Sequence, residues 1–415
     1  MNNNNSFKRR LFLFFLFFFF VFSAFSNDPL EIKIAVIGPG DELYFWWGHI
    51  GLIIENHETG DSRFYDWGVF SFDNENFFLN FAFGRLLYTC AVTRPEFSFY
   101  NYVNTNRDIT LYTLNLTPEK KQEIQQYAIW SMLPENRDYL YHHFQDNCAT
   151  RIRDIIDIAT DGLFGEKYKN TPGRFTLREH VRRHTWFNPF FDWILNFWMG
   201  QVIDTPITVW DEMFLPSEIA LRIEEFAFFD SGSEQRLLSN KEIVFSSSGR
   251  PQVLDAPIRL WPRLLALSLF IALAFILLFV FRQRGSAKAH YIWAIGQGVM
   301  GLFFGGCGLI LFFMNFFTLH DYTYRNINLL YINPLLLAAI PIAILCCIRY
   351  SKSTHINPEK ISKTLWSLVF DLCILSIIIN KLFLGQQNLS DIIFFLPIAA
   401  SLSWLPDLAV LIKRR

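Results

Sequence analysis

Long apolar stretches separate this chain into three parts. An unbroken apolar run covers residues 11–22, and five more stretches follow residue 258, at about 260–281, 290–314, 327–348, 364–384 and 391–412. Each of the five is long enough to cross a bilayer as an α-helix. Between them and the first run, polar and apolar residues are mixed as in a folded, water-exposed domain. The pattern predicts an N-terminal leader, a mixed domain over residues 27–255 and an all-α transmembrane domain of five helices over residues 256–415.

The leader has the features of a secretory signal peptide. Lys8, Arg9 and Arg10 precede the apolar run, and small residues at Ala24 and Ser26 suit cleavage near Ser26. A signal anchor is the alternative, which the short apolar core makes less favourable. Residues 1–26 are therefore predicted to be removed and the mixed domain to be exported.

The mixed domain is predicted to be α+β. Its expected strands are residues 32–37, 46–54, 63–68, 86–94 and 108–116, and its expected helices are residues 117–132, 174–183, 191–199 and one that begins at Pro216. The strand 46–54 is apolar on both faces, which is typical of a central strand. The helix 191–199 is strongly aromatic, which suits either a core helix or a surface that dips into the outer leaflet.

The segment around Cys148 reads as a turn that runs into an amphipathic helix. Asp146 or Asn147 can cap this helix, and apolar residues then recur at helical spacing. Cys148 falls in the first turn, where the positive end of the helix dipole favours a thiolate. Arg151 and Arg153 are expected to add positive charge there. A thiolate is the nucleophile that cysteine catalysis needs.

His49 and Asp66 can complete a catalytic arrangement with Cys148. A hairpin of strands 46–54 and 63–68 would place Asp66 roughly opposite His49. Cys148 would be the nucleophile, His49 its base and Asp66 the residue that orients the imidazole.

These residues also have simpler interpretations. Cys148 can be a small buried residue or, in an oxidising compartment, the partner of Cys90 in a disulfide. The histidine can be a buried structural residue and the aspartate a cap at a strand end. His142 and His143 are competing bases, which we discount because they fall on the loop before the helix.

Charged residues indicate the membrane topology. Lys and Arg gather after the first predicted span, around the loop after the third and at the C-terminus, whereas the loops 315–326 and 385–390 share one basic residue, Arg325. By the positive-inside rule, the mixed domain lies outside the cytoplasm and the C-terminus inside it. The net charge of −1 gives no sign of a nucleic-acid surface.

Six polar residues fall at or beside the outer loop between the second and third spans, namely Asn315, His320, Asp321, Asn326, Asn328 and Asn333. Four of them, Asn315, His320, Asn326 and Asn328, are the candidate substrate-binding residues. Polar groups at a membrane edge that faces an exported domain suggest a site for a lipid headgroup or a docking contact. A solvated loop with helix caps is an equally good interpretation.

Several segments resemble the Lnb-type lipoprotein N-acyltransferase family of bacteria. The similar segments are Gly38–Tyr44, Gly48-His49, Tyr65–Phe70, Asp146–Asp154, Asn315–His320 and Asn326–Leu330. Asp66 stands where Asn is expected in many members.

The resemblance implies a fold similar to a circularly permuted, papain-like (NlpC-like) domain, in which His49 precedes Cys148. It implies transfer of the sn-2 acyl chain of a diacylglyceryl-cysteine lipoprotein to that protein's N-terminal amine, through a thioester on Cys148. Bacterial lipoproteins and membrane lipid would be the partners, and no cofactor or metal is expected. The protein would lie in the inner membrane.

Two other functions use the same residues differently. A membrane-anchored cysteine peptidase or amidase would use Cys148 and His49 on cell-wall peptides, and a non-catalytic envelope scaffold would use neither. An apolar groove between Cys148 and the membrane would favour acyl transfer, an open polar cleft would favour the amidase, and an oxidised Cys148 would favour the scaffold. The oligomeric state and the identity of the lipoprotein substrates stay open.

Overall fold

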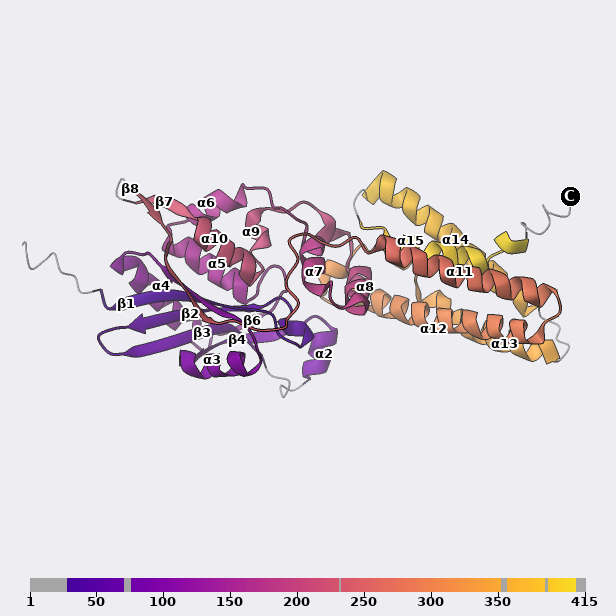
Figure 1. Cartoon of the computed structure of the whole chain (residues 1–415), viewed down its shortest axis with the longest axis horizontal. Helices are drawn as coiled ribbons and strands as arrows, with labels where there is room; N and C mark the ends of the chain where they lie inside the picture. The colour runs from indigo at the N-terminus through magenta and orange to yellow at the C-terminus, as the bar shows by residue number, and fades with distance from the viewer. Residues whose placement is uncertain (1–27, 71–75, 231–232, 352–356, 385–386, 408–415) are drawn as a thin grey trace, which may run out of the picture.

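A computed structural model describes residues 28–70, 76–230, 233–351, 357–384 and 387–407 of the chain. The predicted signal peptide lies outside the described residues. Figure 1 shows a sheet-containing domain at one end of an elongated molecule and a bundle of long helices at the other.

The first domain is built on a seven-stranded antiparallel sheet with the order β6-β4-β3-β2-β1-β5-β9. The strands are β1 (Leu30–Ile37), β2 (His49–Asn56), β3 (Asp61–Val69), β4 (Leu87–Thr93), β5 (Ile109–Leu114), β6 (Asp138–Leu140) and β9 (Leu238–Phe245). A separate pair joins β7 (Ala227–Asp230) and β8 (Ser233–Arg236). All five predicted strands are present, whereas β6 to β9 were not anticipated.

Helices cover both faces of this sheet (Figure 1). The helices α4 (Pro118–Ser131), α5 (Cys148–Ala159) and α10 (Pro216–Glu225) bury their apolar sides against one face, and α3 (Pro95–Asn104) covers the other. In β2, Leu52 packs in the first of these cores and Ile53 in the second. The apolar pattern of residues 46–54 therefore identified a strand buried on both faces, and that strand is central.

Several shorter helices complete the part of the chain that precedes the long helices. They are α2 (Phe77–Ala82), α6 (Leu163–Lys169), α7 (Leu177–Thr185), α8 (Pro189–Trp198) and α9 (Val209–Glu212). Helices over 174–183 and 191–199 were predicted, and α7 and α8 occupy these positions.

The second domain is helical. Its elements are α11 (Trp261–Gln283), α12 (Ala287–Phe317), the 3-10 turns η4 (Ile327–Leu330) and η5 (Pro334–Ala338), α13 (Ala339–Ser351), α14 (Pro358–Ile379), a π-helical turn (Asn380–Leu384) and α15 (Ser390–Leu402). Within the described residues, four segments are long and apolar enough to cross a membrane, namely Trp261–Gln283, Ala287–Phe317, Ile327–Arg349 and Pro358–Leu382. The fifth predicted span is represented by the shorter apolar helix α15, so the count of five stays a prediction.

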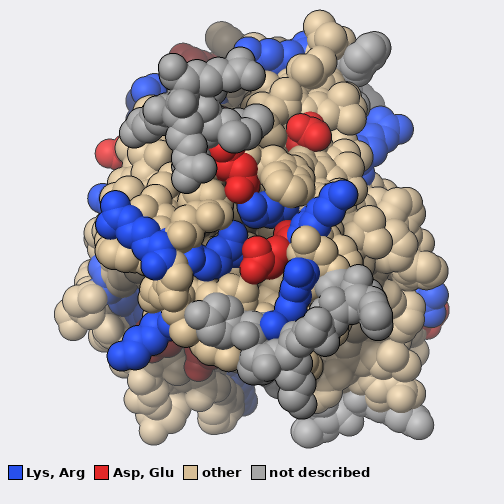
Figure 2. Space-filling view, turned by 90° about the vertical axis from the view of Figure 1, so that its right-hand side faces the viewer, with Lys and Arg blue, Asp and Glu red and all other residues tan. Residues whose placement is uncertain are grey.

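Basic side chains gather at the end of the helical domain that is remote from the sheet (Figure 2). Arg282 lies in the last turn of α11, and Lys360 lies near the start of α14. This is the asymmetry on which the predicted orientation rests.

The aromatic helix α8 joins the two domains. Trp193 stacks on Phe303 of α12 with 5.7 Å between the ring centroids, and Phe197 is fully buried in the core of the helical domain. Trp193 and Phe197 are therefore core residues, whereas Phe190 is 55% exposed, so contact of that side chain with the outer leaflet stays a prediction.

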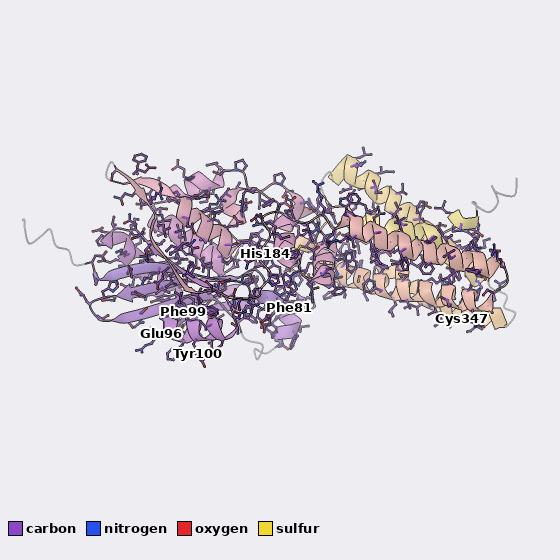
Figure 3. The ribbon with its side chains drawn as sticks, in the orientation of Figure 1. Phe81, Glu96, Phe99, Tyr100, His184 and Cys347 are labelled. Atoms are coloured by element: carbon purple, nitrogen blue, oxygen red, sulfur yellow. The ribbon has the colours of Figure 1, made fainter. Side chains whose placement is uncertain are left out.

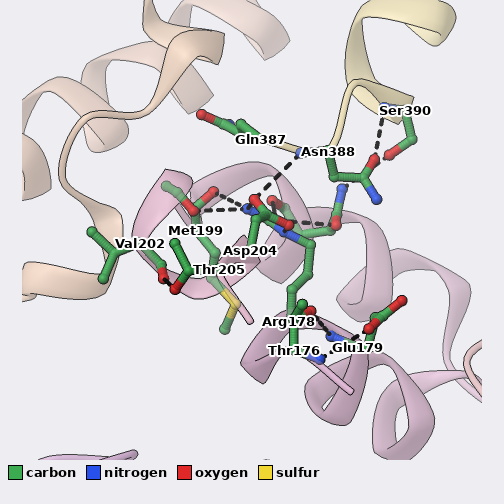
Figure 4. A network of polar contacts seen from close by, with 12 residues as sticks. Thr176, Arg178, Glu179, Met199, Val202, Asp204, Thr205, Gln387, Asn388 and Ser390 are labelled. Atoms are coloured by element: carbon green, nitrogen blue, oxygen red, sulfur yellow. Dashed lines mark hydrogen bonds and ion pairs between the residues drawn. The ribbon is translucent and has the colours of Figure 1, made fainter. Parts of the chain in front are cut away.

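A buried polar network strengthens this joint (Figure 4). Arg178 of α7 donates to both carboxylate oxygens of Asp204 at 2.7 and 2.9 Å and to the carbonyl oxygens of Met199 and Gly200. Asp204 also accepts a hydrogen bond from the backbone of Asn388, just before α15. The network fixes the sheet domain relative to the helical domain, because a buried arginine is stable only with its partners in place.

Candidate active site

Cys148 is the first residue of α5, as the sequence predicts. Asn147 caps the helix: its side chain accepts from the Thr150 N–H at 2.9 Å, and Thr150 Oγ1 accepts from the Asn147 N–H at 2.8 Å. The Asn147 side-chain amide also donates to the carbonyl of Phe214, which anchors the turn to another part of the domain. The thiol is thus held rigidly at the positive end of a helix.

The structure brings His49 and Asp66 together beside this cysteine. His49 Nε2 lies 2.9 Å from Asp66 Oδ1, and the imidazole shares a hydrogen bond with the Cys148 thiol. Asp66 Oδ1 also accepts from the Gly68 N–H at 2.7 Å. Since Nε2 faces the carboxylate, Nδ1 is the ring nitrogen left for the thiol.

Two glycines allow this geometry. Gly48, directly before His49, has a φ of 78°, a conformation that favours glycine. Gly68 lies against the imidazole, and a Cβ atom there would overlap with His49 Cε1. The chain therefore turns sharply into β2 and leaves the His49 ring room over the neighbouring strand.

The electrostatics favour a charged pair. Burial alone would lower the pKa of His49, but the charges of Asp66 and Cys148 outweigh it and raise that pKa to about 10. Burial opposes ionisation of Asp66 as well, yet the His49 charge, two hydrogen bonds and the charge of Arg107 hold its pKa below the usual value. The arrangement can therefore hold a His49 imidazolium beside the Asp66 carboxylate and within hydrogen-bonding reach of Cys148.

A small cavity of about 60 Å³ adjoins these residues. Most of its lining is aromatic or apolar: besides His49, Cys148, Asn147 and two glycines, it consists of Tyr44, Phe45, Trp47, Phe70, Tyr88, Tyr141, His143, Phe214 and Pro216. The space admits a reacting carbonyl group but is too small for a whole acyl chain.

Some sequence-based expectations for this site are wrong. Arg151 donates two hydrogen bonds to Asp146, at 2.7 and 2.8 Å, and Arg153 pairs with Asp154. These carboxylates neutralise most of the positive charge that was expected to assist the thiol. The alternative disulfide is absent as well, because all six cysteines, each within the described residues, are unpaired.

The competing bases are occupied elsewhere. His142 Nε2 lies 2.8 Å from Asp321 in the helical domain, and His142 Nδ1 accepts two backbone N–H groups. His143 lines the cavity, and burial lowers its pKa to about 3, so that it is a poor base at neutral pH. Cys90 is also unsuited to chemistry, since burial raises the pKa of its thiol to about 12.

The four polar residues of the outer loop lie in or near the joint between the domains. Asn326 and Asn328 both donate to the carbonyl of Phe197 in α8, at 2.8 and 3.0 Å, and His320 Nε2 donates to the carbonyl of Phe81 at 3.1 Å. Asn315 lines an open apolar cavity of about 880 Å³ on the helical domain. A role for these residues in binding a lipid headgroup stays a prediction, and three of them have structural partners.

Sequence reasoning missed several residues that shape the site. Arg107 is buried, donates to the carbonyl of Gly38 at 2.9 Å and lies over the Phe45 ring at 4.3 Å. It stands two residues before the start of β5, and an isolated arginine there carries no signal in the sequence. Gly68 follows Trp67 in a predicted strand, where a glycine is a recognisable sign of close approach.

A metal site is not suggested near Cys148. In the described ranges, one group of three residues comes within ligand distance of one another, Glu31, Glu55 and His57. The ammonium of Lys33 already lies 2.8 and 2.7 Å from the two carboxylates, which makes this group an ion-pair network.

Comparison with known families agrees with this geometry. Residues 22–182 match the family model described as the Lnb N-terminal periplasmic domain. The N-terminal part of the chain belongs to the Lnb family. The matched part includes His49, Asp66 and Cys148 and ends within α7, so the resemblance noted in the sequence is confirmed for this part of the chain. The similar segments Asn315–His320 and Asn326–Leu330 lie outside the match. The searches of curated proteins and of solved structures found no match.

The Lnb domain and the apolar helices together describe a membrane-anchored envelope protein with a periplasmic domain. Membership of the Lnb family suggests a lipoprotein-modifying enzyme.

We expect Asp66→Asn to leave substantial activity at neutral pH. The substitution should also lower the pH above which the reaction of Cys148 with an ester slows, which we call the alkaline limit. An amide oxygen can still accept the imidazole N–H, but the charge that raises the His49 pKa is lost. The shift should be about one pH unit or more, the usual effect of a neighbouring opposite charge. The rate of Cys148 acylation by an ester substrate, followed from about pH 6 to about pH 11, measures the shift, because the leaving alcohol takes its proton from the His49 imidazolium.

Asp61→Asn is the matched control, since Asp61 begins the same strand and is paired with Arg63 at its exposed end. An unmoved alkaline limit in Asp66→Asn would show that Asp66 does not set the His49 charge.

Proposed function

We propose that this protein is a lipoprotein N-acyltransferase that uses Cys148 as its nucleophile. The acyl donor would be the sn-2 ester of a diacylglyceryl-cysteine lipoprotein, and the acceptor would be the N-terminal amine of that lipoprotein. The observation that carries the proposal is the array of Asp66, His49 and Cys148 at an aromatic cavity, in a Lnb domain joined to membrane-spanning helices.

The lining of the cavity favours a lipid substrate over a peptide. A cell-wall amidase has to bind charged, hydrogen-bonding peptides and would be expected to offer an open polar cleft. Here the walls beside Cys148 are mostly aromatic rings. Apolar walls suit an acyl chain, because they remove its surface from water without leaving polar groups unpaired.

In the first step, the Cys148 thiolate attacks the sn-2 ester carbonyl. The tetrahedral intermediate collapses by breaking the bond to the glycerol oxygen, and that oxygen takes a proton from the His49 imidazolium. An acyl thioester on Cys148 and a free hydroxyl on the lipid result. The Cys148 and Ala149 N–H groups precede the hydrogen-bond ladder of α5 and can stabilise the oxyanion.

In the second step, the N-terminal amine of the lipoprotein attacks the thioester. His49, neutral after the first step, accepts a proton from the attacking nitrogen. The carbon–sulfur bond then breaks, the amide forms and the thiolate returns beside the imidazolium. The product is a lyso-form lipoprotein with an N-acyl group, and splitting the transfer in two lowers each barrier.

The order of the catalytic residues supports the permuted papain-like fold that the resemblance implies. His49 begins β2, and Cys148 begins a helix packed on the same sheet, so the histidine precedes the cysteine along the chain.

We further propose that the protein is a multi-pass inner-membrane protein with a cytoplasmic C-terminus. A reporter that is active only outside the cytoplasm should be active when fused after Leu389 and silent when fused after Lys352, a residue outside the described part of the chain. The reason is the asymmetry of basic residues between these loops. The opposite pattern would contradict both the five-span topology and a periplasmic Cys148.

Mass spectrometry of lipoprotein N-termini tests the function directly. Cells that make the protein should contain lyso-form lipoproteins with one acyl chain on the amine and one on the glycerol. Cells without it should retain the diacylglyceryl form with a free amine. Identical N-termini in both would exclude the proposed reaction.

A further inference from the structure

Helix α2 and the neighbouring end of α12 expose a group of large apolar side chains, which we call the α2 surface. It consists of Phe78, Leu79, Phe81, Phe316, Phe317 and Leu319, each at least half exposed and Phe78 exposed by 75%. Figure 1 shows α2 between the sheet and the outer ends of the long helices. Phe78, Leu79 and Phe81 follow one another closely on a helix of the sheet domain, and three exposed apolar side chains in one short helix are typical of an interaction surface.

The two parts of the α2 surface are held together. The Leu319 N–H donates to the Phe83 carbonyl at 2.9 Å, and the Phe83 ring lies 5.4 Å from that of Phe313 in α12. The hydrogen bond between His320 and the Phe81 carbonyl adds a third contact. The α2 surface is therefore a rigid continuation of a membrane-spanning helix, not a separate patch.

Aromatic rings connect this surface to the Cys148 cavity. Phe77 of α2 lies 6.4 Å from Phe81 and stacks on Phe70 with 6.0 Å between the ring centroids. Phe70 in turn lies 5.5 Å from Tyr44 and 5.0 Å from Tyr88. Phe70, Tyr44 and Tyr88 all line the cavity, so apolar contacts run from the end of α12 to its wall.

The size of the cavity explains why such a surface is needed. A space of about 60 Å³ holds the reacting ester and little more, so the rest of the acyl chain has to lie outside it. An acyl chain drawn out of the bilayer is unfavourable in water unless an apolar protein surface covers it.

We propose that the α2 surface binds the sn-2 acyl chain of the diacylglyceryl lipoprotein and leads it from the outer leaflet to the Cys148 cavity. The proposal rests on the proposed acyl transfer and adds the path of the substrate. The outer leaflet is the source of this occupant because the surface continues α12, which spans the membrane.

Two thiol probes test this path on the full-length protein in vesicles of phosphatidylethanolamine and phosphatidylglycerol. One is a phospholipid that carries a maleimide on its sn-2 chain, and the other is water-soluble N-ethylmaleimide. We expect Phe78→Asp and Phe81→Asp each to slow lipid-probe labelling of Cys148 by about tenfold or more, because a charge opposes apolar contact. Labelling by N-ethylmaleimide should change by less than about twofold, since the thiol itself is untouched.

Tyr100→Asp is the matched control, because Tyr100 is similarly exposed, at 69%, but lies on α3. Figure 3 labels Phe81 near the helical domain and Tyr100 at the lower edge of the sheet domain. This variant should behave as the wild type with both probes. Peptide mass spectrometry identifies Cys148 as the labelled residue and separates it from Cys347, which Figure 3 places at the remote end of the helices.

Three results would overturn the path. They are wild-type rates in both α2 variants, an equal slowing with both probes, or no lipid-probe labelling of wild-type Cys148. None of these results depends on turnover of a lipoprotein, so they test the path alone. The proposed function is tested separately, because it fails if lyso-form lipoproteins appear without Cys148.

Discussion

Cys148→Ser should abolish the formation of lyso-form lipoprotein. Serine fits the first position of α5, so the fold should persist, but its hydroxyl is a far weaker nucleophile than a thiolate beside His49. We expect a loss of roughly four to six orders of magnitude, comparable with removal of the nucleophile in other enzymes of this kind. Lipoprotein N-termini from cells that make the variant provide the measurement.

Cys90→Ser is the matched control for this substitution. Cys90 is buried in the sheet domain and unpaired, so replacing it removes a thiol without touching the site. It should retain most activity, with at most a loss of stability. Full activity in Cys148→Ser would refute the mechanism.

His49→Ala should reduce activity to nearly the same extent. The imidazole shares a hydrogen bond with the thiol and supplies the proton for the leaving glycerol oxygen, so both steps lose their acid or base. When catalytic residues act as a unit, removing any one of them lowers the activity by a similar factor. We therefore expect His49→Ala to lower the activity by roughly four orders of magnitude or more. Single-turnover acylation of Cys148 measures the first step alone.

Gly68→Ala tests the same role without removing the histidine. The added methyl group would occupy the space of His49 Cε1, so the ring has to move away from Asp66 and Cys148. Activity should fall sharply while the protein still accumulates in the membrane. Near-normal activity in either variant would mean that His49 is not the base.

The arrangement of the site was largely predictable from local patterns. The apolar run before Glu55 and the polar turn after it define a hairpin, and the alternation of side chains in a hairpin brings Asp66 and His49 to the same face. Their contact is diagonal, since Gly68 lies opposite the ring. The capping residues before Cys148 and the helical spacing after it define the start of α5 equally well.

Other features depend on contacts that no local pattern contains. Arg151 and Arg153 look like cations near a thiol until their partners Asp146 and Asp154 are seen. The aromatic residues of α8 and of α2 look alike in the sequence, but Trp193 is buried against the long helices and Phe78 is exposed. Only the packing of the two domains separates a core helix from a surface helix.

The roles of the outer-loop residues change for the same reason. His320 and Asn328 were predicted to lie at the membrane edge, and their side chains donate to the carbonyl groups of Phe81 and Phe197. His320→Ala therefore perturbs the joint as well as any headgroup contact. Cys148 labelling by a small thiol reagent separates these effects, because it reports the site without the lipid.

Trapping the acyl-enzyme is the most direct test of the central claim, that Cys148 carries the acyl chain. The purified protein, mixed with a diacylglyceryl lipopeptide whose amine is blocked, cannot complete the second step. Intact-protein and peptide mass spectrometry should then find one acyl chain on Cys148, removed by neutral hydroxylamine as expected for a thioester and absent in His49→Ala. An unmodified Cys148, or an acyl chain on another residue, would contradict the account.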